Sequence, residues 1–139
     1  MLENGIQSFI KTVGDEGCYA LCLCAVADLE ADFTDEFPAG TTVNIIKEGV
    51  KKGFLKDDMT VMDGAAFLQL ISGRKWTKDY KDAGYVPQKG DSLVAEWFNR
   101  RTGLTHFTLE HPVKWDGLKD SVTVKEGKIR SYRLYRVKS

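Results

Sequence analysis

The sequence predicts an α+β domain in which helices in the first half of the chain pack on one side of an antiparallel sheet formed by the second half. Two observations lead to this class. Up to about residue 71 the apolar residues recur at helical spacing, and from residue 74 onward short alternating segments are separated by turns. The length of 139 residues and the hydrophobic content of 42% fit a single folded domain spanning residues 1–139.

Four helices are predicted. Residues 2–12 carry apolar side chains on one face, and residues 17–31 are apolar nearly all round, which predicts a buried helix. Thr41 or Thr42 caps a third helix that stops at Gly53. The fourth spans residues 62–71, with Asp63 near its start and Gly73 after its end.

The second half of the chain predicts strands joined by turns. Residues 74–85 are weakly extended, and residues 92–98 and 104–110 form strands on either side of a turn at 99–103. Further strands are expected at residues 112–115 and at 122–124, the latter pairing with 129–137 across a hairpin turn at 125–128.

Charge and cysteine content exclude several protein classes. Lysine plus arginine equals aspartate plus glutamate at 20 each, so no overall charge favours nucleic acid or a membrane surface. The three cysteines lie within seven residues of one predicted helix, where disulfide geometry is poor, so reduced thiols and a cytoplasmic location are expected. The first residues lack the features of a signal peptide, and no apolar run is long enough to span a membrane.

Cys18 is the leading candidate for a functional residue. It follows Asp15, Glu16 and Gly17 and begins the apolar run of the second helix. The unpaired N–H groups and positive dipole end of a helix start stabilise a thiolate, which is how cysteine hydrolases prepare a nucleophile. A buried cysteine in an apolar helix is the alternative interpretation, because cysteine is among the most buried residue types.

His106 is the candidate base for this thiol. A nucleophilic cysteine needs a base within reach and a third group that orients the base. In residues 104–109 strand alternation sets His106 and Thr108 opposite Phe107 and Leu109. Asp116 is the best-placed orienting group, although Asp116-Gly117 is equally well explained as a turn.

Other side chains could complete or compete with this site. Gln7 and Asn99 are amides that could donate to an oxyanion, and Trp115 is one of several aromatic residues that line a groove or fill the core. Zinc could use Cys18, Cys22, His106 and His111, but the two histidines point to opposite faces of an extended segment and no C-x-x-C motif exists. No metal is therefore expected, and no glycine pattern indicates a cofactor phosphate.

The order of these motifs resembles the papain-like cysteine peptidase superfamily, and it is most similar to small bacterial and phage members of the bacteriocin-processing (C39-like) type. The residues that carry the resemblance are Gly-Cys-Tyr-Ala at 17–20, Thr-His-Phe-Thr-Leu at 105–109 and Trp-Asp-Gly at 115–117. The resemblance implies a papain-like fold with Cys18 as nucleophile, His106 as base and Asp116 as orienting group. It also implies a peptide or protein substrate and a reaction at an amide, isopeptide or thioester bond.

Two departures from that family lead to a second hypothesis. The family usually has Asp-Pro where this chain has Asp116-Gly117, and an oxyanion glutamine where this chain has Thr12 and Val13. The alternative is a catalytically inactive papain-like binding module, for example a phage- or mobile-element-encoded protein that engages a host protein.

Overall fold

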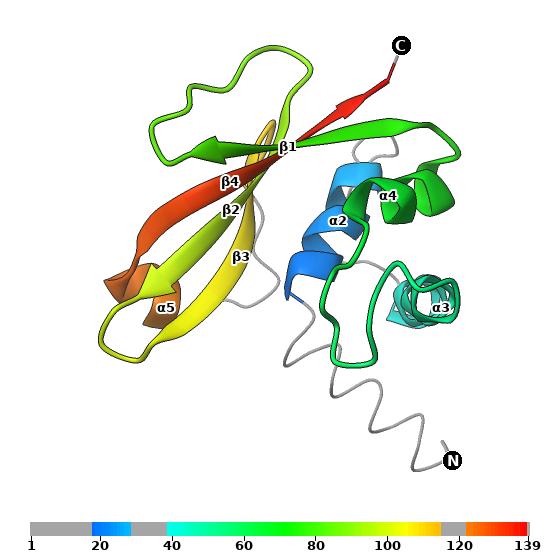
Figure 1. Cartoon of the computed structure of the whole chain (residues 1–139), viewed down its shortest axis with the longest axis horizontal. Coiled ribbons are helices and arrows are strands. Elements are labelled where there is room, and N and C mark those ends of the chain that lie inside the picture. The colour runs from blue at the N-terminus through cyan, green and yellow to red at the C-terminus, as the bar shows by residue number, and fades with distance from the viewer. Residues whose placement is uncertain (1–17, 29–38, 115–121, 139) are drawn as a thin grey trace.

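A four-stranded antiparallel sheet lies beside a group of helices in the computed structural model (Figure 1). The structure describes residues 18–28, 39–114 and 122–138. The α+β class is confirmed, because α2, α3 and α4 precede the strands along the chain. The elements are α2 (Cys18–Asp28), α3 (Ala39–Lys51), α4 (Gly64–Ser72), β1 (Trp76–Asp82), β2 (Ser92–Asn99), β3 (Leu104–His111), α5 (Val122–Glu126) and β4 (Lys128–Val137).

The strand order in the sheet is β1-β4-β2-β3, with every neighbouring pair antiparallel. The predicted hairpin of β2 and β3 is confirmed, and its turn ends at Gly103, whose φ of +71° favours glycine. The last strand, β4, lies between β1 and β2. Among the described residues, β3 is therefore an edge strand of the sheet.

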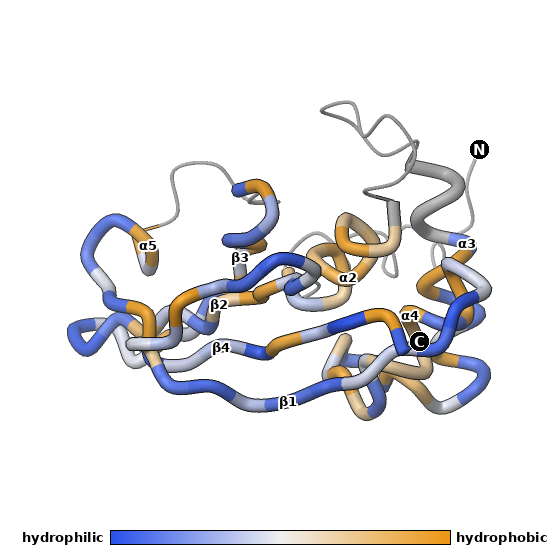
Figure 2. The backbone as a smooth tube through the Cα atoms, turned by 90° about the horizontal axis from the view of Figure 1, so that it is seen from above, coloured by the Kyte–Doolittle hydropathy of each residue, from blue (hydrophilic) through white to orange (hydrophobic). Residues whose placement is uncertain are grey.

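The core forms between α2 and the sheet. Every residue from Cys22 to Ala25 is fully buried, in agreement with the apolar tube of α2 in Figure 2. Val94, Leu109 and Tyr135 from three different strands belong to the same buried cluster. Burial of most of the surface of α2 accounts for the nearly continuous apolar run in the sequence.

Helix α4 spans Gly64–Ser72 rather than residues 62–71, and Asp63 and Gly73 stand at its ends as the sequence predicts. The Asp63 carboxylate accepts a hydrogen bond from the Ala66 N–H at 3.0 Å, and Gly73 closes the helix in the left-handed region with its N–H donating to Gln69. Replacing Asp63 with alanine removes the cap, so we expect the free energy of unfolding to fall by about 1 kcal/mol. Urea unfolding measures this loss, and Asp57→Ala in an exposed loop is the control, with an expected change near zero. An equal loss in both variants would contradict the role of the cap.

The structure corrects two predicted strands. Residues 122–126 form α5 rather than a strand, and Pro112 and Val113 form a bend. Strand β4 is paired with β2 on one edge and with β1 on the other along most of its length, so little edge is left for a hairpin partner. Helix α5 instead packs at the β2–β3 turn, where Glu126 pairs with Arg101 at 2.8 Å. Long-range strand pairing therefore overrides the local β propensity.

Other predicted boundaries differ less. Helix α3 begins at Ala39, before the expected caps at positions 41 and 42, and it is followed by Gly53 with a φ of +81°, as predicted. The predicted helix at residues 2–12 lies outside the described residues. Of the helices that the structure describes, none has the length and apolar character needed to cross a membrane.

A buried carboxylate fixes the start of β2 to the end of β4. Asp91 is 1% exposed, and it accepts hydrogen bonds from Arg136, from the Tyr85 hydroxyl at 2.6 Å and from the Gln88 N–H at 2.8 Å. Burial alone would raise the pKa of Asp91, but these donors outweigh burial and hold the pKa at about 2. Asp91 therefore remains charged in the folded protein at a pH where an ordinary aspartate is half protonated.

This pKa predicts an acid-dependent loss of stability. Because the folded pKa lies below the unfolded value, the contribution of Asp91 is present above about pH 4 and is lost as the pH falls toward 2. Because Arg136 is half exposed, solvent weakens its interaction with Asp91, and we expect the Asp91 carboxylate to contribute only on the order of 1–2 kcal/mol to the free energy of unfolding. Urea unfolding at pH 5 and pH 2.5 should show a steeper loss in the wild type than in Asp91→Asn. Parallel losses in the two proteins would contradict the prediction.

Candidate functional site

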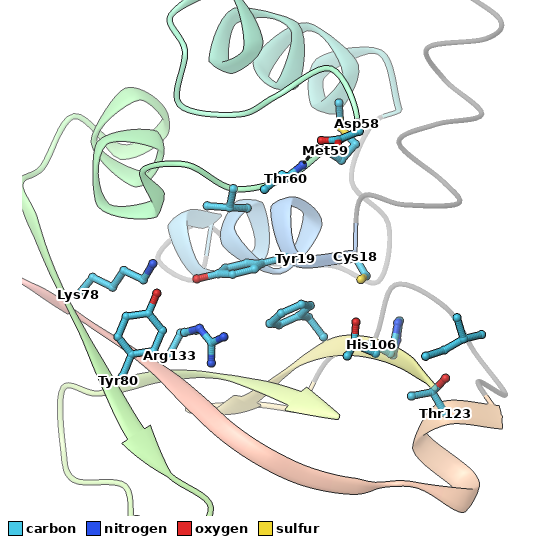
Figure 3. A pocket seen from close by; sticks show the side chains of 14 residues that line it. Cys18, Tyr19, Asp58, Met59, Thr60, Lys78, Tyr80, His106, Thr123 and Arg133 are labelled. Carbon is cyan, nitrogen blue, oxygen red and sulfur yellow. Dashed lines mark hydrogen bonds between the residues drawn. The ribbon is translucent and has the colours of Figure 1, made fainter. Parts of the chain in front are cut away.

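A cleft with a volume of about 540 Å³ opens between α2, the loop after α3 and the sheet. Figure 3 shows this cleft with side chains from both walls. Residues from α2, β1, β3, β4 and α5 contribute to it, so it depends on segments distant in the sequence. The lining residues are Cys18, Tyr19, Asp58, Met59, Thr60, Val61, Lys78, Tyr80, Leu104, Thr105, His106, Phe107, Thr123 and Arg133.

Cys18 is the first residue of α2 and lines the cleft. It is half-buried, whereas Cys22 and Cys24 on the same helix are fully buried. All three thiols are free of disulfides. The Cys22 thiol lies 3.5 Å from the Phe107 carbonyl oxygen, where it attaches α2 to β3. Of the three cysteines, Cys18 is thus the one whose sulfur a ligand in the cleft can meet.

His106 reaches the same cleft from β3. The predicted alternation holds on the core side, because Leu109 belongs to the core cluster and the Phe107 ring stacks on Tyr19 with centroids 4.5 Å apart. His106 is 5% exposed and lines the cleft as well, which is possible because β3 is the edge strand. In Figure 3 the Cys18 sulfur and the His106 imidazole face each other across the opening between α2 and β3. A thiol and an imidazole facing one space could act as nucleophile and base.

Asn99 does not lie in the cleft lining. Its side-chain oxygen accepts hydrogen bonds from the N–H groups of Arg101 and Thr102, and its amide nitrogen donates to the Val122 carbonyl and to Glu126. The amide is therefore engaged in the β2–β3 turn and its contact with α5. The structure does not bring Asn99 together with Cys18 and His106.

Three other candidate residues lie outside the described part of the chain. They are Gln7, Trp115 and Asp116. The roles of oxyanion donor, groove residue and orienting carboxylate thus stay predictions for these positions.

The residues of the zinc alternative are spread over different surroundings. Cys22 is buried against β3, and the His111 Nδ1 atom lies 2.9 Å from the Asp91 carbonyl oxygen. Within residues 18–28, 39–114 and 122–138, no group of three or more histidine, cysteine or acidic side chains is arranged to hold a metal ion. His111 is half-buried.

Comparison with known protein families adds one finding. Residues 2–137 match the family model described as "Protein of unknown function, DUF261". The chain belongs to this DUF261 family. No curated protein and no solved structure matched the chain. Since the family match runs from residue 2 to residue 137, it includes all of the cleft residues of this DUF261 member.

The end of the cleft opposite Cys18 carries cations that the sequence analysis did not single out. Lys78 and Tyr80 come from β1, and Arg133 comes from β4, where it is the register partner of Tyr80. The Arg133 guanidinium lies over the Tyr80 ring at 4.6 Å, and the Lys78 ammonium lies 4.9 Å from the same ring. Lys78 and Tyr80 are two residues apart on a strand, and this spacing was the one sequence signal that their side chains share a face.

Two tyrosine hydroxyls lie at the interface of α2 and the sheet. The Tyr19 and Tyr135 hydroxyl oxygens are 2.6 Å apart. Burial raises the pKa of Tyr19 to about 12, and burial also raises the pKa of Tyr135. Both groups therefore stay neutral at physiological pH, and Tyr19 presents a neutral hydroxyl at the cleft.

The loop at residues 56–60 contributes Asp58, Met59 and Thr60 to the wall of the cleft. The Thr60 N–H donates to the Asp58 carboxylate at 3.0 Å, and the Lys56 N–H donates to the Thr60 carbonyl at 2.9 Å. Met59 is buried with a φ of +70°, a conformation that non-glycine residues rarely adopt. Backbone in this region costs about 1–3 kcal/mol and persists where packing enforces it, often beside functional sites.

Proposed function

We propose that the protein is a papain-like cysteine hydrolase that acts on an amide, isopeptide or thioester bond. One observation carries the proposal: Cys18 of α2 and His106 of β3 line the same cleft although they are far apart in the sequence. The order of a cysteine at the first residue of a buried helix and a histidine on a later strand of an antiparallel sheet supports the papain-like assignment.

In the proposed reaction the Cys18 sulfur attacks the substrate carbonyl carbon while His106 accepts the thiol proton. Collapse of the tetrahedral intermediate breaks the bond to the leaving group, which receives that proton from the imidazolium. Water then attacks the thioester with His106 as base, which releases the acid and restores the thiol. Backbone N–H groups near Cys18 donate to the oxyanion, and Asp116 orients the imidazole.

The test is hydrolysis of a panel of fluorogenic peptides, isopeptides and aryl thioesters, with mass spectrometry of the acylated protein. The expected result is turnover by the wild type with the acyl group on Cys18, and its complete loss in Cys18→Ala. Cys24→Ala is the matched control, since that thiol is fully buried and outside the cleft lining. Turnover that persists in Cys18→Ala would overturn the proposal. Absence of hydrolysis, together with partner capture that Cys18→Ala leaves unchanged, would favour the inactive binding module.

A further inference from the structure

We infer that the cleft accepts a substrate bearing a carboxylate, which binds at the end formed by Lys78, Tyr80, Arg133 and Tyr19. The inference rests on the proposed function only in taking Cys18 as the reacting end of the cleft. In Figure 3 the polar tips of Lys78, Tyr80 and Tyr19 converge at the far end from Cys18, with the Arg133 guanidinium beside them. These groups come from α2, β1 and β4, so the fold itself assembles them.

The balance of charge at this end is positive. Arg133 donates to Glu96 at 3.0 Å and to Ser131 at 2.7 Å, so Glu96 offsets one of the two cations. Among the described residues that line the cleft, Asp58 carries the single carboxylate, and it is hydrogen-bonded within the loop at the other wall. Lys78 is half-buried, and its charge is thus available to a ligand that enters the cleft.

Besides the two cations, the hydroxyl groups of Tyr80 and Tyr19 can donate hydrogen bonds to a ligand at this end of the cleft. The Lys78 ammonium and the Arg133 guanidinium lower the pKa of Tyr80, with Lys78 the larger cause. An environment that favours a phenolate over a phenol also favours a bound carboxylate over its acid. Tyr19 stays neutral, and its hydroxyl can donate to a ligand while it accepts the hydrogen bond of the Tyr135 hydroxyl. A carboxylate with its four acceptor positions suits such a set of donors.

The size of the cleft is compatible with a peptide that carries the carboxylate. A volume of about 540 Å³ falls in the range of sites that enclose a small ligand. The carboxylate could belong to an acidic side chain or to the carboxyl terminus of a peptide. Both sources share one chemistry, and matched probes distinguish them.

The experiment measures alkylation of Cys18 by three chloroacetyl dipeptides. One carries glutamate and a carboxamide end, one carries glutamine and a free carboxyl end, and the neutral third carries glutamine and a carboxamide end. Each forms a bond from the Cys18 sulfur to the acetyl carbon while chloride leaves and the thiol proton passes to the imidazole or to solvent. At low salt we expect one anionic probe to react roughly fivefold to tenfold faster than the neutral probe, with a smaller ratio at high salt.

Substitutions on β1 identify the cation responsible. Lys78→Met should bring the ratio of anionic to neutral rates close to one, and Lys78→Arg should largely retain it. Lys81→Met is the matched control, because Lys81 lies on the same strand at the opposite alternation and does not line the cleft. Equal rates for all probes in the wild type, or a ratio that Lys78→Met leaves unchanged, would overturn the inference.

The outcome does not depend on hydrolysis. A charge preference without turnover on any substrate would reject the hydrolase and keep the carboxylate site. Turnover without a charge preference would keep the hydrolase and reject the carboxylate site. If no probe reacts with Cys18, the acetyl versions of the three peptides are titrated into Cys18→Ala and binding is followed by nuclear magnetic resonance. Anionic peptides that bind no more tightly than the neutral one in that titration also overturn the inference.

Discussion

Replacing His106 with alanine should slow the alkylation of Cys18 by iodoacetamide at pH 6 by roughly tenfold to a hundredfold. At this pH an isolated thiol is almost wholly protonated and reacts slowly, whereas a thiol that gives its proton to an imidazole reacts as the thiolate. His106 and Cys18 line one cleft, and in the proposed reaction the imidazole takes that proton. The rate is measured by peptide mass spectrometry, which separates Cys18 from Cys22 and Cys24.

The matched control for this prediction is His111→Ala. His111 lies on the same strand, is bonded to the Asp91 carbonyl and does not line the cleft, so its loss should leave the rate of Cys18 alkylation unchanged. Cys22 and Cys24 are fully buried and should react only after unfolding. A wild-type rate in His106→Ala would show that the imidazole does not act on the thiol.

Replacing Gly64 with alanine should lower the free energy of unfolding by about 1–3 kcal/mol. A Cβ atom at this position would stand 2.1 Å from the Tyr135 hydroxyl oxygen and 3.0 Å from the ring carbon that bears it. Tyr135 is fully buried and its hydroxyl is bonded to that of Tyr19, so the ring cannot move aside without breaking this contact. The strain falls where α4, α2 and β4 meet, and urea unfolding measures its cost.

A double substitution tests the cause of that cost. Tyr135→Phe removes the hydroxyl, so Gly64→Ala should cost about 1–2 kcal/mol less in the Tyr135→Phe background than in the wild type. Gly84→Ala is the control, because its Cβ would meet only a carboxylate oxygen at 3.4 Å. Additive losses for Gly64→Ala and Tyr135→Phe would show that the hydroxyl is not what excludes a side chain at position 64.

Local signals predicted the elements whose geometry is local. Asp63 and Gly73 delimit α4 through hydrogen bonds to nearby backbone, and the turn ending at Gly103 closes the β2–β3 hairpin. At Val122 the local signal was misleading. Its β-branched side chain favours a strand, but the neighbouring strand β4 is already paired with β1 and β2, and Val122 begins helix α5 instead. The competition for the edges of β4 is a long-range property that no short segment contains.

The same division applies to the candidate site. Cys18 and His106 could be selected because their chemistry is rare and their local patterns are informative, and both line the cleft. Asn99 could not be assigned correctly, since an amide in a turn looks alike whether it serves a ligand or the turn itself. Lys78 and Arg133 were missed because basic residues on strands are common, and only the pairing of β1 with β4 brings these two together.

The strand order has a consequence for the synthesis of the protein. Because β4 lies between β1 and β2, a nascent chain that has not yet delivered residues 128–137 holds two strands with unpaired edges and no strand to join them. Sheets with such distant pairings form slowly and expose edges that aggregate in the meantime. Strand β4 carries Arg133 and also joins β1, with Lys78, to the sheet, so both cations of the cleft reach their places only in the last step of sheet assembly. Unfinished chains would carry the thiol of Cys18 without the surface proposed to select its substrate.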